Sequence, residues 1–378
     1  MLVRYTTKKN GKRVPLAKIY TGSEHPINKS LIDKDAIKIV ARLSSHGYDA
    51  YIVGGAVRDL MIGRKPKDFD IVTSALPREI KKIFWNSRLI GKRFRLVHLY
   101  YPHKIIEVST FRSGDEGNNS YGTIEEDVKR RDFSINALYY NPQNEYILDF
   151  IDAFKDIKKG RVRSLIPLDT TFVEDPVRMI RAVKYSATTG FKIPALLKRT
   201  IKKYSGELGR CSTSRMTEEV IKILLSGSSS LIFEMLFEMK LLQYILPRIN
   251  ELIKSSKLTY MKFIQGLSEN DILVREKNES RKGRLISGMV SPLIMFPNDY
   301  ENTTTLFHDI FKEVKNLISP LTPPNQEVEM AVVKLFRNEG LTPPKNAVRK
   351  RRPRIEKKPG PKAKNKAQHH EMSRYYKK

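Results

Sequence analysis

The chain has 378 residues and a formal net charge of +29 at pH 7, a balance that favours a nucleic-acid partner. Its single cysteine, Cys211, excludes an intramolecular disulfide framework and fits a reducing compartment. Because no apolar run approaches ~20 residues and no His/Cys cluster has zinc-ligand spacing, we expect neither a membrane span nor a zinc site. The first twenty residues lack the apolar core of a secretory signal, so we expect a cytoplasmic protein.

A glycine pair follows the first predicted strand. Residues 49–53 form a short apolar run, and Gly54 and Gly55 can turn the chain tightly into a helix that begins near Ala56. Such a turn presents backbone N–H groups to an anion, which is a common way to hold a triphosphate. A glycine pair is equally typical of an ordinary turn, so the pair alone leaves both interpretations open.

Two carboxylates come next. Residues 68–72 alternate charged and apolar side chains, as a half-buried strand does. On such a strand Asp68 and Asp70 point to the same face, about 7 Å apart, where they can share two divalent ions. Hard oxygen ligands favour Mg²⁺ over zinc. The alternative is a solvated strand end without a metal.

Two further segments carry charged residues on predicted elements. The β-branched run at 104–111 predicts a strand that carries Glu107. Asp132 is expected to cap an amphipathic helix that runs through Leu138, with Arg131 in solvent. Each of these charged residues also has a purely structural interpretation, as an exposed ion pair or a helix cap.

A third predicted helix begins in a proline-containing segment. Asp175 as the cap and Pro176 as the first helical residue predict a helix that ends at Gly190. Arg178 and Arg181 share one face of it, and Asp175 lies one turn below Arg178. A guanidinium beside a carboxylate can bind the Watson–Crick edge of a base through paired hydrogen bonds. The same pattern is typical of a capped helix with an i,i+3 ion pair.

From residue 168 onward the strand signals fade and helical periodicity takes over. Apolar residues have helical spacing over 221–225, 231–242 and 245–249, and helical patterns continue to about residue 337. We interpret these apolar faces as plain core packing.

The C-terminal segment, residues 349–378, is strongly basic. Its thirteen Lys or Arg residues and two Glu residues make up +11 of the net charge. Such a segment buries too little apolar surface to fold alone, so we expect a disordered arm that binds RNA backbones. The alternatives are nonspecific solubility or ribosome association.

Four blocks of sequence together indicate a particular protein family more specifically than any one block does. They are Gly54-Gly55-Ala-Val-Arg58-Asp59 with Asp68-Phe-Asp70, Glu107-Val-Ser-Thr-Phe-Arg112, Arg130-Arg131-Asp132-Phe-Ser-Ile-Asn136-Ala, and Glu174-Asp175-Pro176-Val-Arg178-Met-Ile-Arg181. In this order they resemble the family of bacterial poly(A) polymerases and CCA-adding tRNA nucleotidyltransferases, the class II branch of the polymerase-beta-like nucleotidyltransferases. The resemblance covers residues 51–181, and a looser one extends to about residue 247.

The resemblance implies template-independent transfer of a nucleotide to RNA 3′ ends, with two Mg²⁺ ions as cofactors and ATP as substrate. It implies that Asp68 and Asp70 hold the metal and that Glu107 is a third catalytic carboxylate. It also implies a nucleotide-binding set that consists of Gly54, Gly55, Arg58, Arg131, Asp132, Asn136, Asp175, Arg178 and Arg181.

The segment 89–98 resembles the poly(A) polymerase branch more than the CCA-adding branch. Lys92, Arg93 and Arg95 in this segment would place positive charge along the RNA path beside the carboxylates. The alternative for these residues is an exposed basic edge strand. We predict a poly(A) polymerase and leave its protein partners open. A CCA-adding enzyme, an inactive RNA-binding protein and a nucleotidyltransferase that modifies small molecules or proteins are the other hypotheses.

The expected fold class is α+β. We expect a polymerase-beta-like nucleotidyltransferase head with a mixed, mostly antiparallel sheet, followed by helical parts. The expected divisions are an N-terminal leader (1–35), the head (36–167), a neck with the nucleotide-selecting helix (168–250), a helical RNA-binding body (251–345) and a basic disordered tail (346–378).

Overall fold

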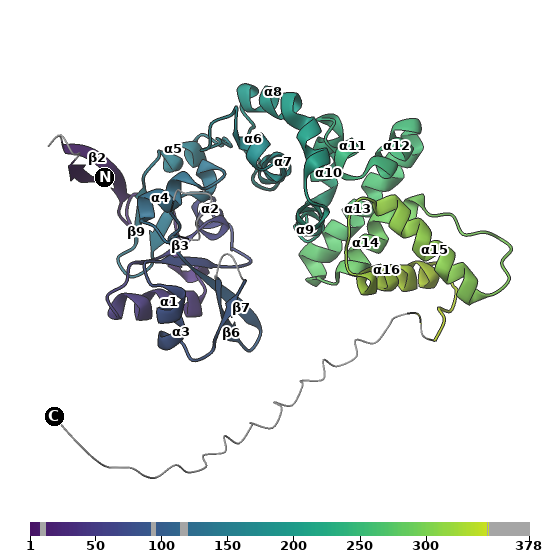
Figure 1. Cartoon of the computed structure of the whole chain (residues 1–378), viewed down its shortest axis with the longest axis horizontal. Coiled ribbons are helices and arrows are strands. Elements are labelled where there is room, and N and C mark those ends of the chain that lie inside the picture. The colour runs from purple at the N-terminus through teal and green to yellow at the C-terminus, as the bar shows by residue number, and fades with distance from the viewer. Residues whose placement is uncertain (8–12, 92–95, 114–119, 346, 348–378) are drawn as a thin grey trace, which may run out of the picture.

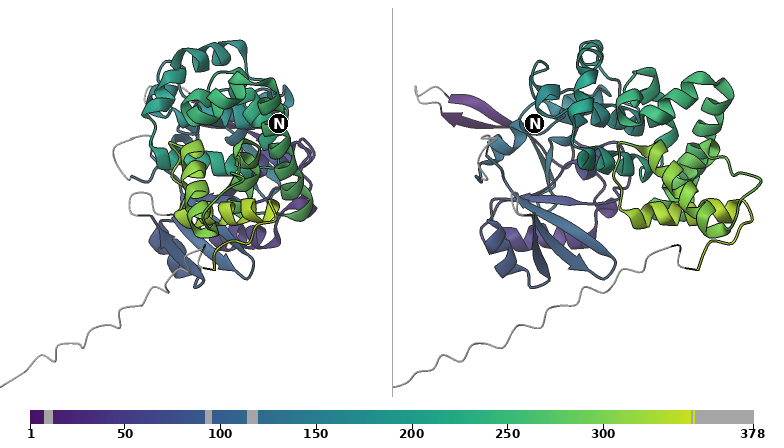
Figure 2. Two further views of the ribbon diagram at one scale, coloured as in Figure 1. Left: turned by 90° about the vertical axis from the view of Figure 1, so that its right-hand side faces the viewer. Right: turned by 45° about the vertical axis from the view of Figure 1, so that its right-hand side comes forward.

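The computed structural model describes residues 1–7, 13–91, 96–113, 120–345 and 347. A head built on a β-sheet is followed by a wholly helical part (Figure 1). Figure 2 shows the same two parts from other sides, with an N-terminal hairpin that projects from the head. The basic tail and the segment with Lys92, Arg93 and Arg95 lie outside the described residues.

In the described part of the chain, the head contains one nine-stranded sheet of order β1-β2-β9-β8-β3-β4-β7-β6-β5. Only the β4–β7 pair is parallel, which confirms a mixed and mostly antiparallel sheet. The segment expected to be a leader supplies the first two strands. The strands are β1 Leu2–Thr7, β2 Arg13–Tyr20, β3 Ala50–Val53, β4 Asp70–Thr73, β5 Ser87–Ile90, β6 Leu96–Tyr101, β7 Lys104–Thr110, β8 Tyr139–Asn141 and β9 Tyr146–Asp149.

Helices α1 (Lys34–Ser45) and α3 (Pro77–Ile83) pack on one face of the sheet, against β3 to β6. Their apolar residues and alternate residues of β4, β6 and β7 form the core of the head. Helices α2 (Gly55–Met61) and α4 (Ile124–Lys129) connect strands, and α5 (Ala153–Lys158) follows the last strand. The sheet therefore has a packed face, and along β5 to β7 every second residue points to the opposite face.

The helical part confirms the periodicity seen after residue 168. It consists of α6 Thr171–Glu174, α7 Val177–Thr189, α8 Ala195–Tyr204, α9 Thr213–Leu224, α10 Ser229–Glu238, α11 Leu242–Ile245, α12 Pro247–Ser255, α13 Lys257–Lys277, α14 Lys282–Val290, α15 Thr303–Ile318 and α16 Asn325–Asn338. The buried carboxylate of Asp271 on α13 accepts the backbone N–H groups of Ser229 and Ser230, which fixes the start of α10. None of the helices described is both long and apolar enough to cross a membrane.

Two predicted helix starts are wrong in detail. Asp132 caps no α-helix, because the chain after it forms only a single 3-10 turn at Ser134–Asn136. Pro176 is the N-cap of α7, and Asp175 lies one residue before it with no side-chain capping bond. The predicted end at Gly190 is confirmed, since this glycine has a φ of 77° that favours a residue without a Cβ.

Candidate active site

The three predicted carboxylates lie at one end of the parallel strand pair. Asp70 is the first residue of β4 and pairs in register with Glu107 on β7. Asp68 lies two residues before the strand, so the expected strand spacing does not describe it. All three residues are exposed to solvent. Glu107 Oε1 also lies 3.2 Å from His98 Nε2, which gives this carboxylate a neighbour on β6.

Electrostatic crowding at this site is strongest at Asp70. Loss of solvation in the surrounding recess raises the pKa of Asp70 to about 7, and the negative charges of Asp68 and Glu107 contribute to the rise. The side chain still has accessible surface, because the recess opens to solvent. A divalent cation would relieve this repulsion, and the carboxylate oxygens are the donor type that Mg²⁺ prefers. Among the residues described, however, no three His, Cys, Asp or Glu side chains converge as a ready metal site.

The glycine turn lies against Asp70. Gly54 has a φ of 72° and precedes α2, so the expected tight turn from strand to helix is confirmed. A Cβ on Gly54 would lie 3.6 Å from Asp70 Oδ2, in ordinary contact. The left-handed backbone at Gly54 is therefore the constraint that favours glycine, and it brings the start of α2 beside the carboxylate.

Arg58 on α2 is buried and bonded to the protein from all three of its guanidinium nitrogens, and it also lines the larger cleft. Its Nη1 donates to Asn136 Oδ1 at 2.9 Å, and its Nε and Nη2 donate to Asp59 Oδ1 at 2.9 and 2.8 Å. Its guanidinium carbon lies 5.3 Å from the centre of the Tyr185 ring on α7. The structure thus brings Arg58 and Asn136 together, in an arrangement that fixes the orientation of the guanidinium.

Arg131 is partly buried, so its expected position in solvent is wrong. Its guanidinium donates to Tyr139 Oη at 2.9 Å, to the Asn136 carbonyl at 3.2 Å and to Asp127 Oδ2 at 2.8 Å. Tyr139 Oη donates to the same Asp127 oxygen at 2.6 Å. This network holds the segment around Asp132 in place although it forms no α-helix.

Two clefts meet at Asp70. The smaller, of about 280 Å³, is lined by Glu107, Ser109, Arg112, Arg130 and other residues of the head. The larger, of about 730 Å³, lies between the head and the helices that follow. Its lining includes Gly55, Arg58, Asp68, Asn136, Arg181, Lys184, Tyr185, Glu219 and Lys222. Asp70 lines both clefts, which puts one carboxylate between two separate binding spaces.

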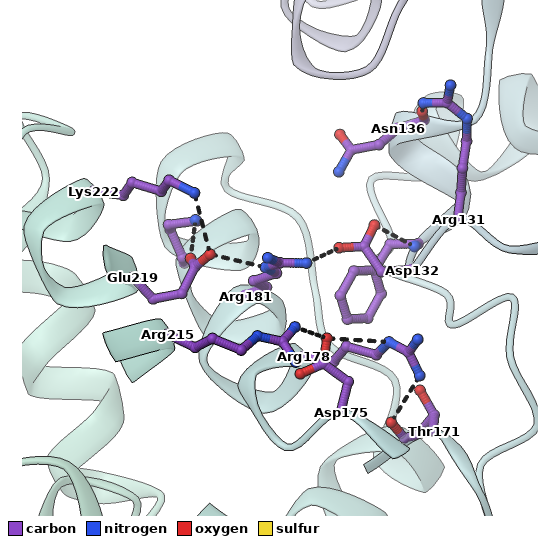
Figure 3. Close-up of polar contacts among 12 residues, drawn as sticks. Arg131, Asp132, Asn136, Thr171, Asp175, Arg178, Arg181, Arg215, Glu219 and Lys222 are labelled. Atoms are coloured by element: carbon purple, nitrogen blue, oxygen red, sulfur yellow. Dashed lines mark hydrogen bonds and ion pairs between the residues drawn. The ribbon is translucent and has the colours of Figure 1, made fainter. Parts of the chain in front are cut away.

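Asp175 lies between two arginines (Figure 3) and is not among the residues that line the larger cleft. Arg215 Nη2 on α9 donates to Asp175 Oδ2 at 2.6 Å, and Arg178 Nε lies 3.9 Å from the same oxygen. Arg178 also donates from Nη1 to the Thr171 carbonyl and to Glu174 Oε2. Asp175 Oδ1 is buried and has no hydrogen-bond partner, so an acceptor is left open at this position.

Arg181 connects the head to α9 (Figure 3). Its Nε donates to Glu219 Oε1 at 3.0 Å, and its Nη1 lies 3.6 Å from Asp132 Oδ2. Glu219 is 2% exposed and also accepts from Lys184 Nζ at 2.6 Å. Burial alone would raise the pKa of Glu219, but the charges of Lys184 and Arg181 outweigh it and lower the pKa to about 2.

Sequence reasoning missed the partners that hold the predicted residues. Arg215 and Glu219 are four residues apart on α9, and this spacing is a signal that they share a helix face. Their partners, Arg181 and Lys184 on α7 and Asp175 just before it, are 35 to 40 residues away, and no local pattern pairs residues at that distance. The i,i+4 pair of Asp127 and Arg131 was also visible in the sequence.

Comparisons with known proteins place the chain in a family. The family model described as "Poly A polymerase head domain" matches residues 50–163, and the one described as "Probable RNA and SrmB-binding site of polymerase A" matches residues 190–253. Poly(A) polymerase I of Salmonella typhi is 35% identical over 295 residues, which cover 73% of this chain and 63% of that protein. Poly(A) polymerase I of an Escherichia coli strain is 38% identical over 253 residues, which cover 62% of this chain and 54% of that protein.

Other members of the family act on tRNA according to their names. A CC-adding tRNA nucleotidyltransferase of Halalkalibacterium halodurans is 37% identical over 197 residues, which cover 52% of this chain and 50% of that enzyme. A solved CCA-adding enzyme in complex with ATP has the same fold, with a TM-score of 0.57, 22% identity, and coverage of 85% of this chain and 74% of that one. The chain spans between half and just under two thirds of the length of these curated relatives. By its sequence blocks, its fold and these similarities, the chain belongs to the class II tRNA nucleotidyltransferase/poly(A) polymerase family.

Proposed function

We propose that this protein transfers AMP from ATP to the 3′ hydroxyl of RNA without a nucleic-acid template. The observation that carries the proposal is the larger cleft, which is lined by Asp68 and Asp70 from the head and by cations from α7 and α9. Its volume of about 730 Å³ is in the usual range for small-molecule sites. Carboxylates on one wall and Arg181, Lys184 and Lys222 on the other suit a metal-bound triphosphate.

Asp68 and Asp70 would hold Mg²⁺, and Glu107 is the candidate third carboxylate. When bound, two such ions lower the pKa of an attacking hydroxyl and stabilise the departing pyrophosphate. The in-register pairing of Asp70 with Glu107 and the raised pKa of Asp70 support this assignment. The absence of a closed three-acid cluster among the described residues means that side chains must rotate, or water and phosphate oxygens must complete the coordination.

We assign the binding of the ATP phosphates to the glycine turn and to Arg58. Gly54 is the N-cap of α2, where the first backbone N–H groups of a helix lack intrahelical partners, and Asn136 holds Arg58 in one orientation. Arg131 and Asp132 are assigned to the sugar, with Asp132 kept in place by Arg181. These roles follow the family resemblance. Gly55 and Arg58 line the larger cleft and Arg131 lines the smaller one, whereas Asp132 lines neither.

The base is assigned to Asp175 and Arg178. The unpaired Oδ1 of Asp175 is an acceptor for an exocyclic amino group, and a guanidinium N–H of Arg178 is a donor for the adjacent ring nitrogen. Adenine and cytosine both present an amino donor beside a ring acceptor, whereas guanine and uracil present the reverse order. This pair therefore selects A or C against G or U.

Replacing Asp175 by Ala is expected to reduce the preference for ATP over GTP by about 10- to 150-fold, the effect of one lost hydrogen bond to a charged group. Single-nucleotide incorporation with each triphosphate measures the preference as a ratio of kcat/KM. Asp169→Ala, which removes an exposed carboxylate six residues earlier, is the matched control and should leave the ratio unchanged. An unchanged ratio in Asp175→Ala would refute the assignment of the base.

AMP is favoured as the transferred group because poly(A) polymerases I are 33–38% identical to this chain. The basic tail and the segment that contains Lys92, Arg93 and Arg95 carry positive charge that suits sequence-independent binding of RNA ends. CCA addition is the second candidate, because CC- and CCA-adding enzymes are 34–37% identical over shorter segments. On either reading, residues 36–167 would act as the head, 168–250 as the neck and 251–345 as the RNA-binding body.

Pyrophosphate release tests whether the protein is an active nucleotidyltransferase. The assay uses ATP, Mg²⁺ and an unstructured RNA with either a free 3′ hydroxyl or a 3′ phosphate. We expect release only with the free hydroxyl and only with the divalent ion. No release from either RNA, or equal release from both, would contradict RNA 3′-end transfer and favour an RNA-binding protein without this activity.

A further inference from the structure

One row of paired residues crosses four strands, from the candidate catalytic carboxylate to the edge of the sheet. Asp70 on β4 pairs with Glu107 on β7, Glu107 pairs with His98 on β6, and His98 pairs with Arg88 on β5. Residues that pair directly across neighbouring strands project from the same face of a sheet. Three strand spacings of ~4.8 Å make this row about 14 Å long.

The face that carries this row is open. Tyr100 and Ile105, which pair in the next row, are 37% and 48% exposed. The alternate residues Leu99 and Ile106 are buried against the helices on the other face. An aromatic ring and an aliphatic side chain are thus presented to solvent directly beside Glu107 and His98.

On this face the Tyr100 ring lies near the Arg88 guanidinium and the His98 ring. The Arg88 guanidinium carbon lies 5.3 Å from the centre of the Tyr100 ring, and the His98 and Tyr100 rings are 6.3 Å apart. Aromatic rings with neighbouring guanidinium groups form the stacking platforms by which proteins bind single-stranded nucleic acid without sequence preference. We define Arg88, His98 and Tyr100 as the Tyr100 face.

We propose that the Tyr100 face binds the last nucleotides of the RNA strand whose 3′ hydroxyl is extended. The inference rests on the proposed function. About 14 Å corresponds to roughly four stacked nucleotides at ~3.4 Å each. Bases stack on Tyr100 and His98, Arg88 contacts a phosphate, and the 3′ end lies at the opposite end of the row, beside Glu107 and Asp70.

The Tyr100 face is continuous with the smaller cleft, and this continuity sets the direction in which the RNA strand would run. Glu107 of the row and Leu96 at the start of β6 both line that cleft, which also contains Asp70, Arg112 and Arg130. The triphosphate is assigned to the larger cleft, which is also lined by Asp70, so the RNA end and the triphosphate reach this carboxylate from two different clefts. Tyr100 can stack on any base, which suits an enzyme that extends unrelated RNA ends.

The test compares Tyr100→Ala with wild type in steady-state AMP addition to an unstructured oligoribonucleotide. Loss of one stacked base should raise the KM for RNA about 5- to 150-fold and leave the KM for ATP unchanged. Tyr100→Phe, which keeps the ring, should behave as wild type. Arg88→Ala should weaken RNA binding and reduce the slope of log affinity against log salt by about 1.

Tyr5→Ala is the matched control. Tyr5 is an exposed tyrosine on the opposite edge strand of the same sheet, with the Arg13 guanidinium carbon 4.5 Å from its ring centre. It should leave the KM for RNA unchanged. Circular dichroism melting of each variant separates a folding defect from a binding defect.

Failure of the inference is distinguishable from failure of the proposed function. If wild type transfers AMP but Tyr100→Ala has an unchanged KM for RNA, the inference is overturned. The exposed face would then bind a different partner, such as a protein. If wild type transfers nothing, fluorescence anisotropy with labelled RNA still tests whether the Tyr100 face binds RNA. Weaker binding by Tyr100→Ala than by wild type supports the inference, and equal binding overturns it.

Discussion

Replacing Asp70 by Asn is expected to reduce AMP transfer at least about a thousandfold while the protein stays folded. Asp70 begins β4, pairs with Glu107 and lines both clefts, so its carboxylate lies between the two spaces that we propose for the substrates. Asn is almost the same size but lacks the charge that a divalent ion requires. The initial rate of radiolabelled AMP incorporation into RNA measures the effect.

The change in stability caused by Asp70→Asn also has an expected direction. Without divalent ions, the pKa of Asp70 is about 7 in the folded protein and close to 3.8 in the unfolded chain. The folded state therefore loses stability as the pH rises from about 4 to about 7, where only the unfolded chain is fully ionised. Asp70→Asn removes this loss and should melt at or above the wild-type temperature at pH 8.

Asp49→Asn is the matched control, because Asp49 is an exposed carboxylate at the far end of the adjacent strand β3. It should retain wild-type transfer. A folded Asp70→Asn protein with activity near wild type would remove the catalytic assignment, and an unfolded one would show that the residue has a structural role as well.

The largest expected effect on stability comes from Glu219→Ala, which should cost about 3–5 kcal/mol of unfolding free energy. Glu219 is 2% exposed, and its oxygens accept from Arg181 and Lys184. Removing the carboxylate leaves two cations in the wall of the cleft without their buried partner. Urea denaturation followed by circular dichroism measures the change.

The pH dependence of the same interaction has the opposite sign to that of Asp70. The pKa of Glu219 is about 2 in the folded protein, against about 4.5 when unfolded. Its stabilisation is complete above pH 4.5 and is lost as the pH falls towards 2. Glu218→Ala removes an exposed neighbouring carboxylate and should change stability by less than about 0.5 kcal/mol. Equal stability of the Glu219 and Glu218 variants would contradict the structural role of this network.

The sequence predicted the elements whose signals are local. The glycine turn at Gly54 and the helix end at Gly190 each depend on a few adjacent residues, and the structure has both. The alternation at 68–72 predicted a half-buried strand that starts at Asp68, but β4 begins at Asp70 and buries its next three residues in succession. The helix expected after Asp132 is absent, because Arg131 turns inward to bond Asp127 and Tyr139 and the chain enters β8. Tertiary contacts here override a local amphipathic pattern.

The candidate site was predicted as a set of residues, and its geometry was not. The sequence places Asp70 and Glu107 on separate strands, and only the parallel pairing of β4 with β7 shows that they are direct neighbours. Arg215 binds Asp175 just before α7, and Glu219 binds Arg181 on α7; both partners are far away in sequence, so no periodicity could identify them. The Tyr100 face was equally hidden, because it depends on the register of four strands.

We propose that this protein adds AMP repeatedly to RNA 3′ ends in general. The most direct test separates the products of extension on a sequencing gel, with a generic unstructured RNA and with a tRNA that lacks its 3′ end, using Mg²⁺ and each triphosphate alone or mixed. We predict long ladders on the generic RNA with ATP alone. Extension confined to the tRNA, dependent on CTP and complete after CCA, would contradict the claim and identify a CCA-adding enzyme.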